Sequence, residues 1–140
     1  MQPHAYVAIV TLLAVLTYFW MGLQVAGARR KSGISAPAMT GDPFLERTIR
    51  AHYNTLEWMP IFLPAMWIFA IYWSDLVAAA LGVVWIAGRI VYQRGYAAAA
   101  DKRSVGFLIQ ALAAAVLLFG GLGRLVYIAL TMPGGLQPQL

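Results

Sequence analysis

A short segment near the middle of this 140-residue chain carries three polar side chains at helical spacing. Arg50, Asn54 and Glu57 stand at positions i, i+4 and i+7, so a helix places them on one face. A guanidinium binds a carboxylate through two parallel hydrogen bonds, and a carboxylate binds an ammonium group. This face therefore suits a ligand that carries charges of both signs.

A second stripe of polar residues follows later in the chain. Arg89, Tyr92 and Tyr96 stand at i, i+3 and i+7, and Arg103 extends the stripe if the helix continues through the intervening alanines. Tyrosine supplies a hydroxyl donor and a flat apolar wall. If the two helices are neighbours, both stripes form one cluster of guanidinium, phenol, amide and carboxylate groups.

Such a cluster suits a ligand with two carboxylates and one amine, and glutathione has that inventory. The chain has no cysteine, so thiol chemistry here requires a thiol on the substrate. A free thiol has a pKa near ~8.5, and a neighbouring arginine lowers that pKa by stabilising the thiolate. The alternative is a self-satisfied network, with Arg50 paired to Glu57 and Arg89 bonded to carbonyl groups. Spacing alone does not choose between the two.

The elements that must position these residues are membrane-spanning helices. The chain is 61% hydrophobic and 11% charged, whereas soluble domains are about 45–50% apolar and about 25% charged. A soluble domain of this length cannot bury so much apolar surface. Composition therefore predicts an all-α integral membrane protein, with one domain over residues 1–140.

Four stretches are long enough to cross a bilayer and predict a four-helix bundle. Asp42 followed by Pro43 is a start signal for the second helix. Pro60 and Pro64 remove two backbone donors inside that helix and predict a bend. The glycine- and proline-rich segment 133–140 predicts a loose tail. The predicted spans cover residues 5–26, 44–73, 76–101 and 104–131.

Basic residues gather at one end of these helices, which predicts a cytoplasmic face there and both termini outside. This bias explains the net charge of +5 without a nucleic-acid partner. This bias alone also accounts for the basic residues at 29–31 and 102–103 without any ligand. The remaining cation, Arg124, is expected to snorkel or to pair with Asp75. The nine residues at the basic end are Arg29, Arg30, Lys31, Arg47, Arg50, Arg89, Arg94, Lys102 and Arg103.

Two strings resemble a known family. The string ERTIRAHYNTLEWMP, from Glu46 to Pro60, resembles the second-helix signature of the MAPEG superfamily, the membrane-associated proteins in eicosanoid and glutathione metabolism. The string RIVYQRGY, from Arg89 to Tyr96, is similar to that family's third helix. The resemblance covers nearly the whole chain, including its four spans, and points to the bacterial microsomal glutathione transferase type.

The resemblance implies a homotrimer that binds glutathione between neighbouring subunits. By motif position, Arg103 matches the arginine that stabilises the thiolate, and Ser104 stands where some members have a catalytic serine. Arg29 and His52 match positions that reach glutathione from the adjacent subunit. The positions that match glutathione-binding residues of the same subunit are Arg50, Asn54, Glu57, Tyr92 and Tyr96.

We therefore expect a membrane glutathione transferase that joins glutathione to a hydrophobic electrophile, with peroxide reduction as a second activity to be tested. Trp58 stands where the leukotriene branch has tyrosine, and Tyr53 where the prostaglandin branch has arginine, so neither eicosanoid specificity is transferred. His4 and His52 are too far apart for metal-ligand spacing, so no metal is expected.

Two other functions compete with this expectation. A non-catalytic lipid-binding or scaffold protein of the same fold is the main alternative, although a scaffold need not keep Arg50, Glu57 and Arg103 together. A small four-helix multidrug exporter would need an acid deep in its first helix, and residues 5–26 contain none.

Overall fold

The computed structural model describes residues 3–132, which form four long helices and one short 3-10 helix. Each long helix is long and apolar enough to cross a membrane, which confirms the predicted all-helical fold with four helices of spanning length. The tail predicted over 133–140 lies outside the described residues. The elements are α1 (Ala5–Ser32), α2 (Pro43–Tyr72), α3 (Asp75–Ala98), η1 (Ala100–Arg103) and α4 (Ser104–Thr131).

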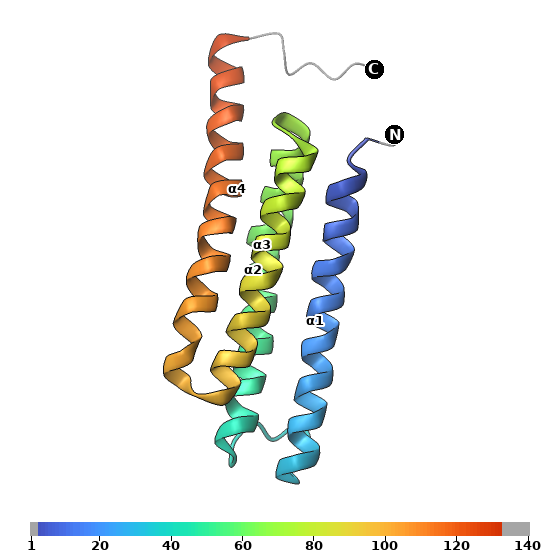
Figure 1. Ribbon diagram of the computed structural model, residues 1–140, viewed down its shortest axis with the longest axis vertical. Coiled ribbons are helices and arrows are strands. Elements are labelled where there is room, and N and C mark those ends of the chain that lie inside the picture. The colour runs from blue at the N-terminus through green and yellow to red at the C-terminus, as the bar shows by residue number, and fades with distance from the viewer. Residues whose placement is uncertain (1–2, 133–140) are drawn as a thin grey trace.

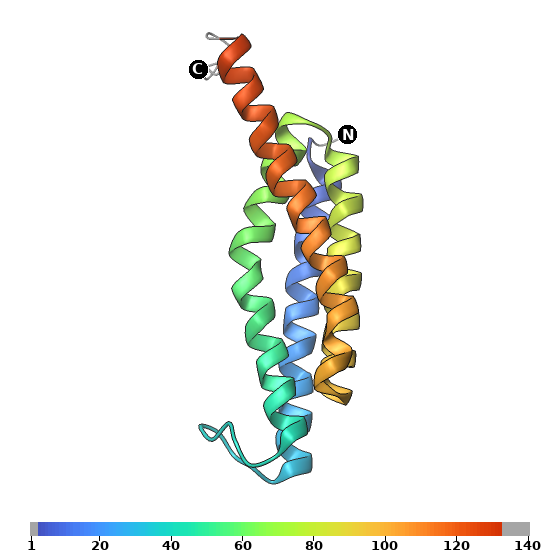
Figure 2. The ribbon, with the colours of Figure 1, turned by 90° about the vertical axis from the view of Figure 1, so that its left-hand side faces the viewer.

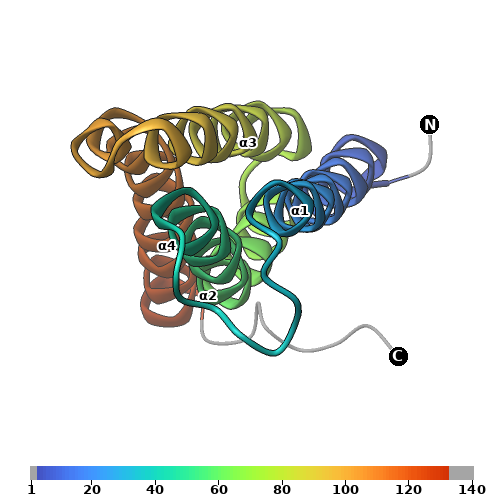
Figure 3. The same ribbon diagram turned by 90° about the horizontal axis from the view of Figure 1, so that it is seen from below.

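The helices run alternately up and down (Figure 1). The start of α1 and the end of α4 lie at one end of the bundle, and the α1–α2 loop and η1 lie toward the other. Figure 2 shows this loop reaching sideways beyond the start of α2. Helices α2 and α3 contact each other and both outer helices, and α1 and α4 lie on opposite sides of that pair (Figure 3).

Local signals in the sequence set the helix ends near the basic end of the bundle. Helix α1 continues six residues past the predicted span, to Ser32, and Gly33 ends it with a left-handed φ of 71°. The Asp42 side chain accepts a hydrogen bond from the Leu45 N–H at 2.8 Å, so it caps α2 as predicted. Helix α2 then continues through both internal prolines.

The third helix is shorter than predicted: α3 ends at Ala98, not at residue 101. Ala99 is extended, with φ −157° and ψ 145°, and its N–H donates to the Gly95 carbonyl. The chain then folds back as η1, so closely that a Cβ on Gly95 would collide with the Lys102 carbonyl. This contact breaks the alanine run, which would otherwise favour helix. Arg103 therefore reaches the tyrosine stripe from a separate element.

Charged side chains tie helix ends together at the opposite end of the bundle. The Asp75 carboxylate accepts the N–H groups of Tyr6 and Val7, at 3.1 and 3.2 Å, and so caps α1. Arg124 does not pair with Asp75. Its Nε donates to the Tyr72 carbonyl at 3.2 Å, and its guanidinium lies over the Trp73 ring. Of the two alternatives for Arg124, the pair with Asp75 is therefore wrong, since the Asp75 carboxylate caps α1.

Helices α3 and α4 approach most closely where two glycines face the opposing backbone. A Cβ added to Gly106 would collide with the Tyr92 backbone nitrogen and lie 2.7 Å from the Gly88 carbonyl oxygen. Both are backbone atoms, so neither can turn aside as a side chain would. This contact sets the distance between Tyr92 on α3 and Ser104 at the start of α4.

We expect Gly106→Ala to lower the free energy of unfolding by about 1–3 kcal/mol, because the added methyl group forces α3 and α4 apart. Thermal unfolding in detergent measures this effect. The matched control is Gly123→Ala on the same helix, where nothing lies within 4 Å of the added Cβ. A melting temperature for Gly106→Ala equal to that of the control would contradict the close approach.

Candidate functional site

Residues of both predicted stripes line one cavity of about 520 Å³ near the basic end of the bundle, whereas Glu57, Arg89 and Tyr96 do not line it. Four elements contribute to its wall: α2, α3, η1 and the first turns of α4. Its polar wall combines two guanidiniums, an amide, a phenol and a hydroxyl, and its other wall is apolar. The lining residues are Arg50, Asn54, Tyr92, Arg103, Ser104, Phe107 and Leu108.

The α2 stripe forms a bidentate ion pair. Arg50 Nη1 donates to Glu57 Oε1 at 2.9 Å, and Nη2 donates to Oε2 at 3.3 Å. Asn54 Nδ2 donates to the same carboxylate at 3.2 Å. Both charged side chains are 52% exposed, and exposed pairs contribute little stability. A ligand carboxylate can therefore take the place of Glu57 on Arg50 at small cost.

Arg89 lies behind this pair and is fully buried. Its Nη1 and Nη2 donate to Asn54 Oδ1 at 3.1 and 3.0 Å, and its Nε and Nη2 donate to Thr55 Oγ1 at 3.1 and 2.6 Å. Its partners are thus side chains of α2, and the backbone-carbonyl bonds considered as an alternative for Arg89 are not formed within residues 3–132. By holding Oδ1, Arg89 leaves the Asn54 amide N–H₂ facing Glu57.

Tyr92 lines this cavity, and Tyr96 lines a neighbouring one. The Tyr92 and Tyr96 rings lie 5.6 Å apart, and the Arg89 guanidinium lies 4.4 Å from the Tyr92 ring centre. Arg103 lies over the Tyr96 ring at 5.2 Å, and its Nη1 donates to the Tyr96 hydroxyl at 3.4 Å. Arg103 therefore joins the tyrosine wall although the third helix ends before it.

Two predicted residues lie apart from this cluster within the protomer. Arg29 Nη1 donates to the carbonyls of Ala38 at 2.6 Å and Ile34 at 3.4 Å, in the α1–α2 loop. His52 stacks on Tyr18 of α1, with ring centres 4.4 Å apart. Both residues therefore belong to the α1 side of the protomer, whereas the cavity lies among α2, α3 and α4.

Comparison with known proteins shows to which family this chain of four long helices belongs. The sequence model of the MAPEG family matches residues 7–123. The chain belongs to the MAPEG family.

Three MAPEG-type relatives align with most of the chain. An uncharacterized protein of Synechocystis sp. is 46% identical over 115 residues, which are 82% of this chain and 84% of that protein. Microsomal glutathione S-transferase 2 of Homo sapiens is 39% identical over 117 residues, 83% of this chain and 80% of that protein. Leukotriene C4 synthase of Bos taurus is 38% identical over 136 residues, 97% and 89% of the two chains.

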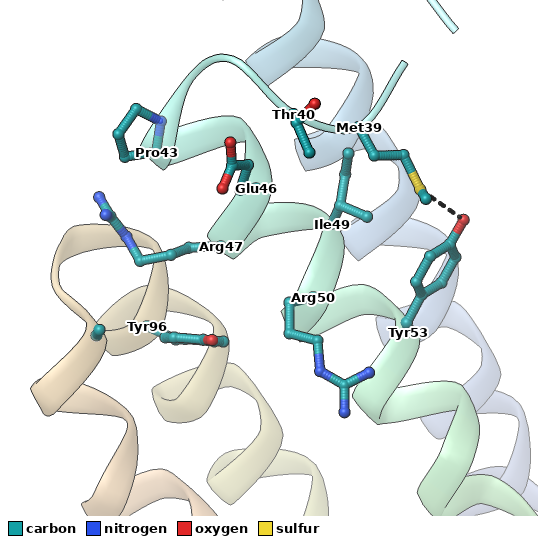
Figure 4. A pocket seen from close by; sticks show the side chains of 10 residues that line it. Met39, Thr40, Pro43, Glu46, Arg47, Ile49, Arg50, Tyr53 and Tyr96 are labelled. Atoms are coloured by element: carbon teal, nitrogen blue, oxygen red, sulfur yellow. Dashed lines mark hydrogen bonds between the residues drawn. The ribbon is translucent and has the colours of Figure 1, made fainter. Parts of the chain in front are cut away.

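A second cavity of about 470 Å³ adjoins the first in this MAPEG chain, and Arg50 lines both. Figure 4 shows its wall, where the α1–α2 loop and the start of α2 face Tyr96. The Tyr53 hydroxyl donates to Met39 Sδ at 3.6 Å and holds the loop against α2. Arg47 donates to the Ala97 carbonyl at 3.3 and 3.2 Å, so it ties α2 to the end of α3.

Sequence reasoning missed two residues that line the first cavity and one that supports it. Phe107 and Leu108 line the cavity, and Phe107 stands at i+3 from Ser104, so helical spacing could have found it. Thr55, which follows Asn54, points into the core and bonds Arg89. Trp58 packs edge-on against Phe107, with ring centres 5.7 Å apart, so it supports the apolar wall without lining the cavity.

Proposed function

We propose that this protein is a membrane-bound glutathione transferase that joins the glutathione thiol to hydrophobic electrophiles. The observation that carries the proposal is the cavity lined by Arg50, Asn54, Tyr92 and Arg103, with Glu57 bonded to Arg50 and Tyr96 bonded to Arg103. The relatives named for glutathione transfer and for leukotriene C4 synthesis support it.

Glutathione would bind by replacing the contacts of the exposed ion pair. One ligand carboxylate would take both N–H groups of Arg50, and the ligand ammonium would take the freed Glu57 carboxylate. Asn54 and the hydroxyls of Tyr92 and Tyr96 would supply further hydrogen bonds. Because Arg89 already fixes Asn54, this part of the site needs little rearrangement.

Arg103 would stabilise the glutathione thiolate. The thiol loses its proton to solvent, and the sulfur then attacks an electrophilic carbon, forming a C–S bond as the leaving group departs with the electron pair. A cation next to the sulfur favours the charged form and lowers the pKa of the thiol below its usual ~8.5. The Ser104 hydroxyl, which donates to the Asp101 carbonyl at 3.3 Å, could turn to donate to the thiolate.

The apolar wall gives the second substrate its place. Phe107 and Leu108 are 39% and 58% exposed at the start of α4, next to the polar wall. A hydrophobic electrophile dissolved in the lipid would reach the sulfur from that side. Holding both reactants in one cavity accelerates the reaction, because the two no longer have to meet in solution. Reduction of a hydroperoxide would use the same thiolate and is part of the same test.

We also propose the homotrimer and its orientation. Arg29 and His52 lie on the α1 side of the protomer, so they could contact glutathione only from a neighbouring copy that presents this side to the cavity. The basic end of the bundle would face the cytoplasm, with both termini outside. Cross-linking or mass measurement in detergent tests the assembly, and a dimer or monomer would contradict it.

The proposed activity is tested with purified protein in detergent. We expect heat on titration with glutathione, a thiolate absorbance band, and conjugation of a generic aromatic electrophile. S-methylglutathione, which has no thiol, should bind without the absorbance band. Absence of both heat and conjugation would overturn the proposal and favour the non-catalytic lipid-binding or scaffold function.

A further inference from the structure

A third cavity, of about 440 Å³, lies where α1, α2 and α3 meet at the basic end of the bundle. It shares no lining residue with the two cavities of the candidate site. Seen from below in Figure 3, these three helices meet on the side away from α4. The lining residues are Trp20, Gln24, Phe44, Thr48, Gln93, Arg94, Ala97 and Ala98.

Gln93 carries an unused hydrogen-bonding group in the wall of this cavity. Its side chain is 3% exposed, and its Oε1 has no hydrogen-bond partner among residues 3–132. A buried acceptor without a partner is unfavourable, and such groups are normally bonded. The neighbouring Thr48 hydroxyl does not help, because it donates to the Phe44 carbonyl at 2.7 Å. Oε1 itself is shielded, so a donor from outside the chain reaches this acceptor once the Gln93 amide turns toward the cavity.

The same cavity carries positive charge that the described part of the chain leaves unbalanced. Arg94 lines the cavity, and within residues 3–132 it makes no ion pair. Lys31 Nζ lies 5.6 Å from the centre of the Phe44 ring, which is also in the wall. No acidic residue lines the cavity. An anion that also carries a hydrogen-bond donor matches this set of groups.

Apolar side chains lead from the cavity toward the middle of the bundle. Leu16 stands one turn before Trp20 on α1 and is 59% exposed, and Val91 stands one turn before Arg94 on α3 and is 42% exposed. Tryptophan is enriched at the headgroup level of membranes, and basic pockets between spanning helices bind anionic headgroups. The ligand should therefore have an apolar part next to its anionic part.

We propose that this cavity binds the headgroup of an anionic phospholipid with free hydroxyl groups, of the phosphatidylglycerol class. The phosphate would lie at Arg94 and near Lys31, and a glycerol hydroxyl would donate to Gln93 Oε1. The acyl chains would lie along Leu16 and Val91. This lipid site is separate from the proposed transferase site and does not depend on it.

The acceptor is tested on the unmodified protein by lipid titration in detergent, followed by native mass spectrometry. Phosphatidylglycerol and phosphatidylethanol carry the same charge, but phosphatidylethanol has no headgroup hydroxyl. We expect phosphatidylglycerol to bind about tenfold more tightly. Equal binding of the two lipids would overturn the role of Gln93. Equal binding of free glycerol phosphate would overturn the lipid assignment in favour of a soluble phosphate ligand.

Substitutions test the contacts to the headgroup hydroxyl and to the phosphate separately. Gln93→Leu should remove the preference for phosphatidylglycerol, and Arg94→Gln should weaken both lipids by about fivefold. Lys102→Gln is the matched control, since it removes an exposed cation at the same end but outside the cavity. If Gln93→Leu does not fold, Arg94→Gln and the paired lipids still decide the proposal. Unchanged binding by Arg94→Gln would overturn it.

Discussion

Replacing Arg103 with alanine is expected to lower the turnover of glutathione conjugation about 100- to 1,000-fold, the usual effect of losing one group that stabilises developing charge. Affinity for glutathione should change little, because the ligand carboxylate and ammonium would be held by Arg50 and Glu57. Turnover with a generic aromatic electrophile and calorimetric titration of glutathione measure the two effects separately. Lys102→Ala, which removes the preceding cation of η1, is the matched control.

The pH profile gives this prediction a second readout. Without Arg103 the bound thiol should return toward its ordinary pKa near ~8.5, so the thiolate fraction at neutral pH falls. Turnover of Arg103→Ala should therefore rise as the pH increases through ~8.5, while the unmodified protein is already near its plateau at lower pH. An unchanged turnover, or a turnover reduced by the same factor at every pH, would remove Arg103 from this role.

Arg89→Met is expected to destabilise the fold and to weaken glutathione binding together. Methionine fills apolar space but leaves the fully buried Thr55 Oγ1, as well as Asn54 Oδ1, without guanidinium donors, and an unpaired buried group costs about 1–3 kcal/mol. The Asn54 amide would then be free to turn away from Glu57, so glutathione affinity should fall about tenfold. Thermal unfolding and calorimetric titration measure the two quantities.

Two further variants test whether Arg89 positions Asn54 for the ligand or only stabilises the fold. Thr55→Val removes the other partner of Arg89 but leaves the Asn54 contacts, so stability should fall while affinity is kept. Combining Arg89→Met with Asn54→Leu removes both ends of the contact, so stability should partly recover while affinity stays low. Recovery of affinity in the double variant would contradict a positioning role.

Spacing along a helix was enough to predict the α2 stripe. Arg50, Asn54 and Glu57 lie together because a helix fixes positions i, i+4 and i+7 locally. The partner of Arg89 was not predictable in the same way. Thr55 meets it across a helix interface, and the register between two helices depends on the packing of both rather than on either pattern.

The end of the third helix shows the same limit. Alanine has the highest helix propensity of any residue type, so the alanine run after Tyr96 predicted that the third helix continues to residue 101. The helix ends at Ala98 instead because η1 packs against Gly95, a tertiary contact. Arg47 is a related case, since it stands one turn before Arg50 in the sequence but its guanidinium donates to the Ala97 carbonyl.

The Arg50–Glu57 pair makes the unliganded cavity wall self-neutral at that point. A zwitterion can exchange with it, because each of its charges finds the partner that the other displaces. A plain mercapto acid gains less, since it would occupy the guanidinium and leave the displaced carboxylate to the Asn54 amide and solvent. The pair would thus favour zwitterionic thiols over small anionic ones on charge balance, in addition to any selection by size or shape.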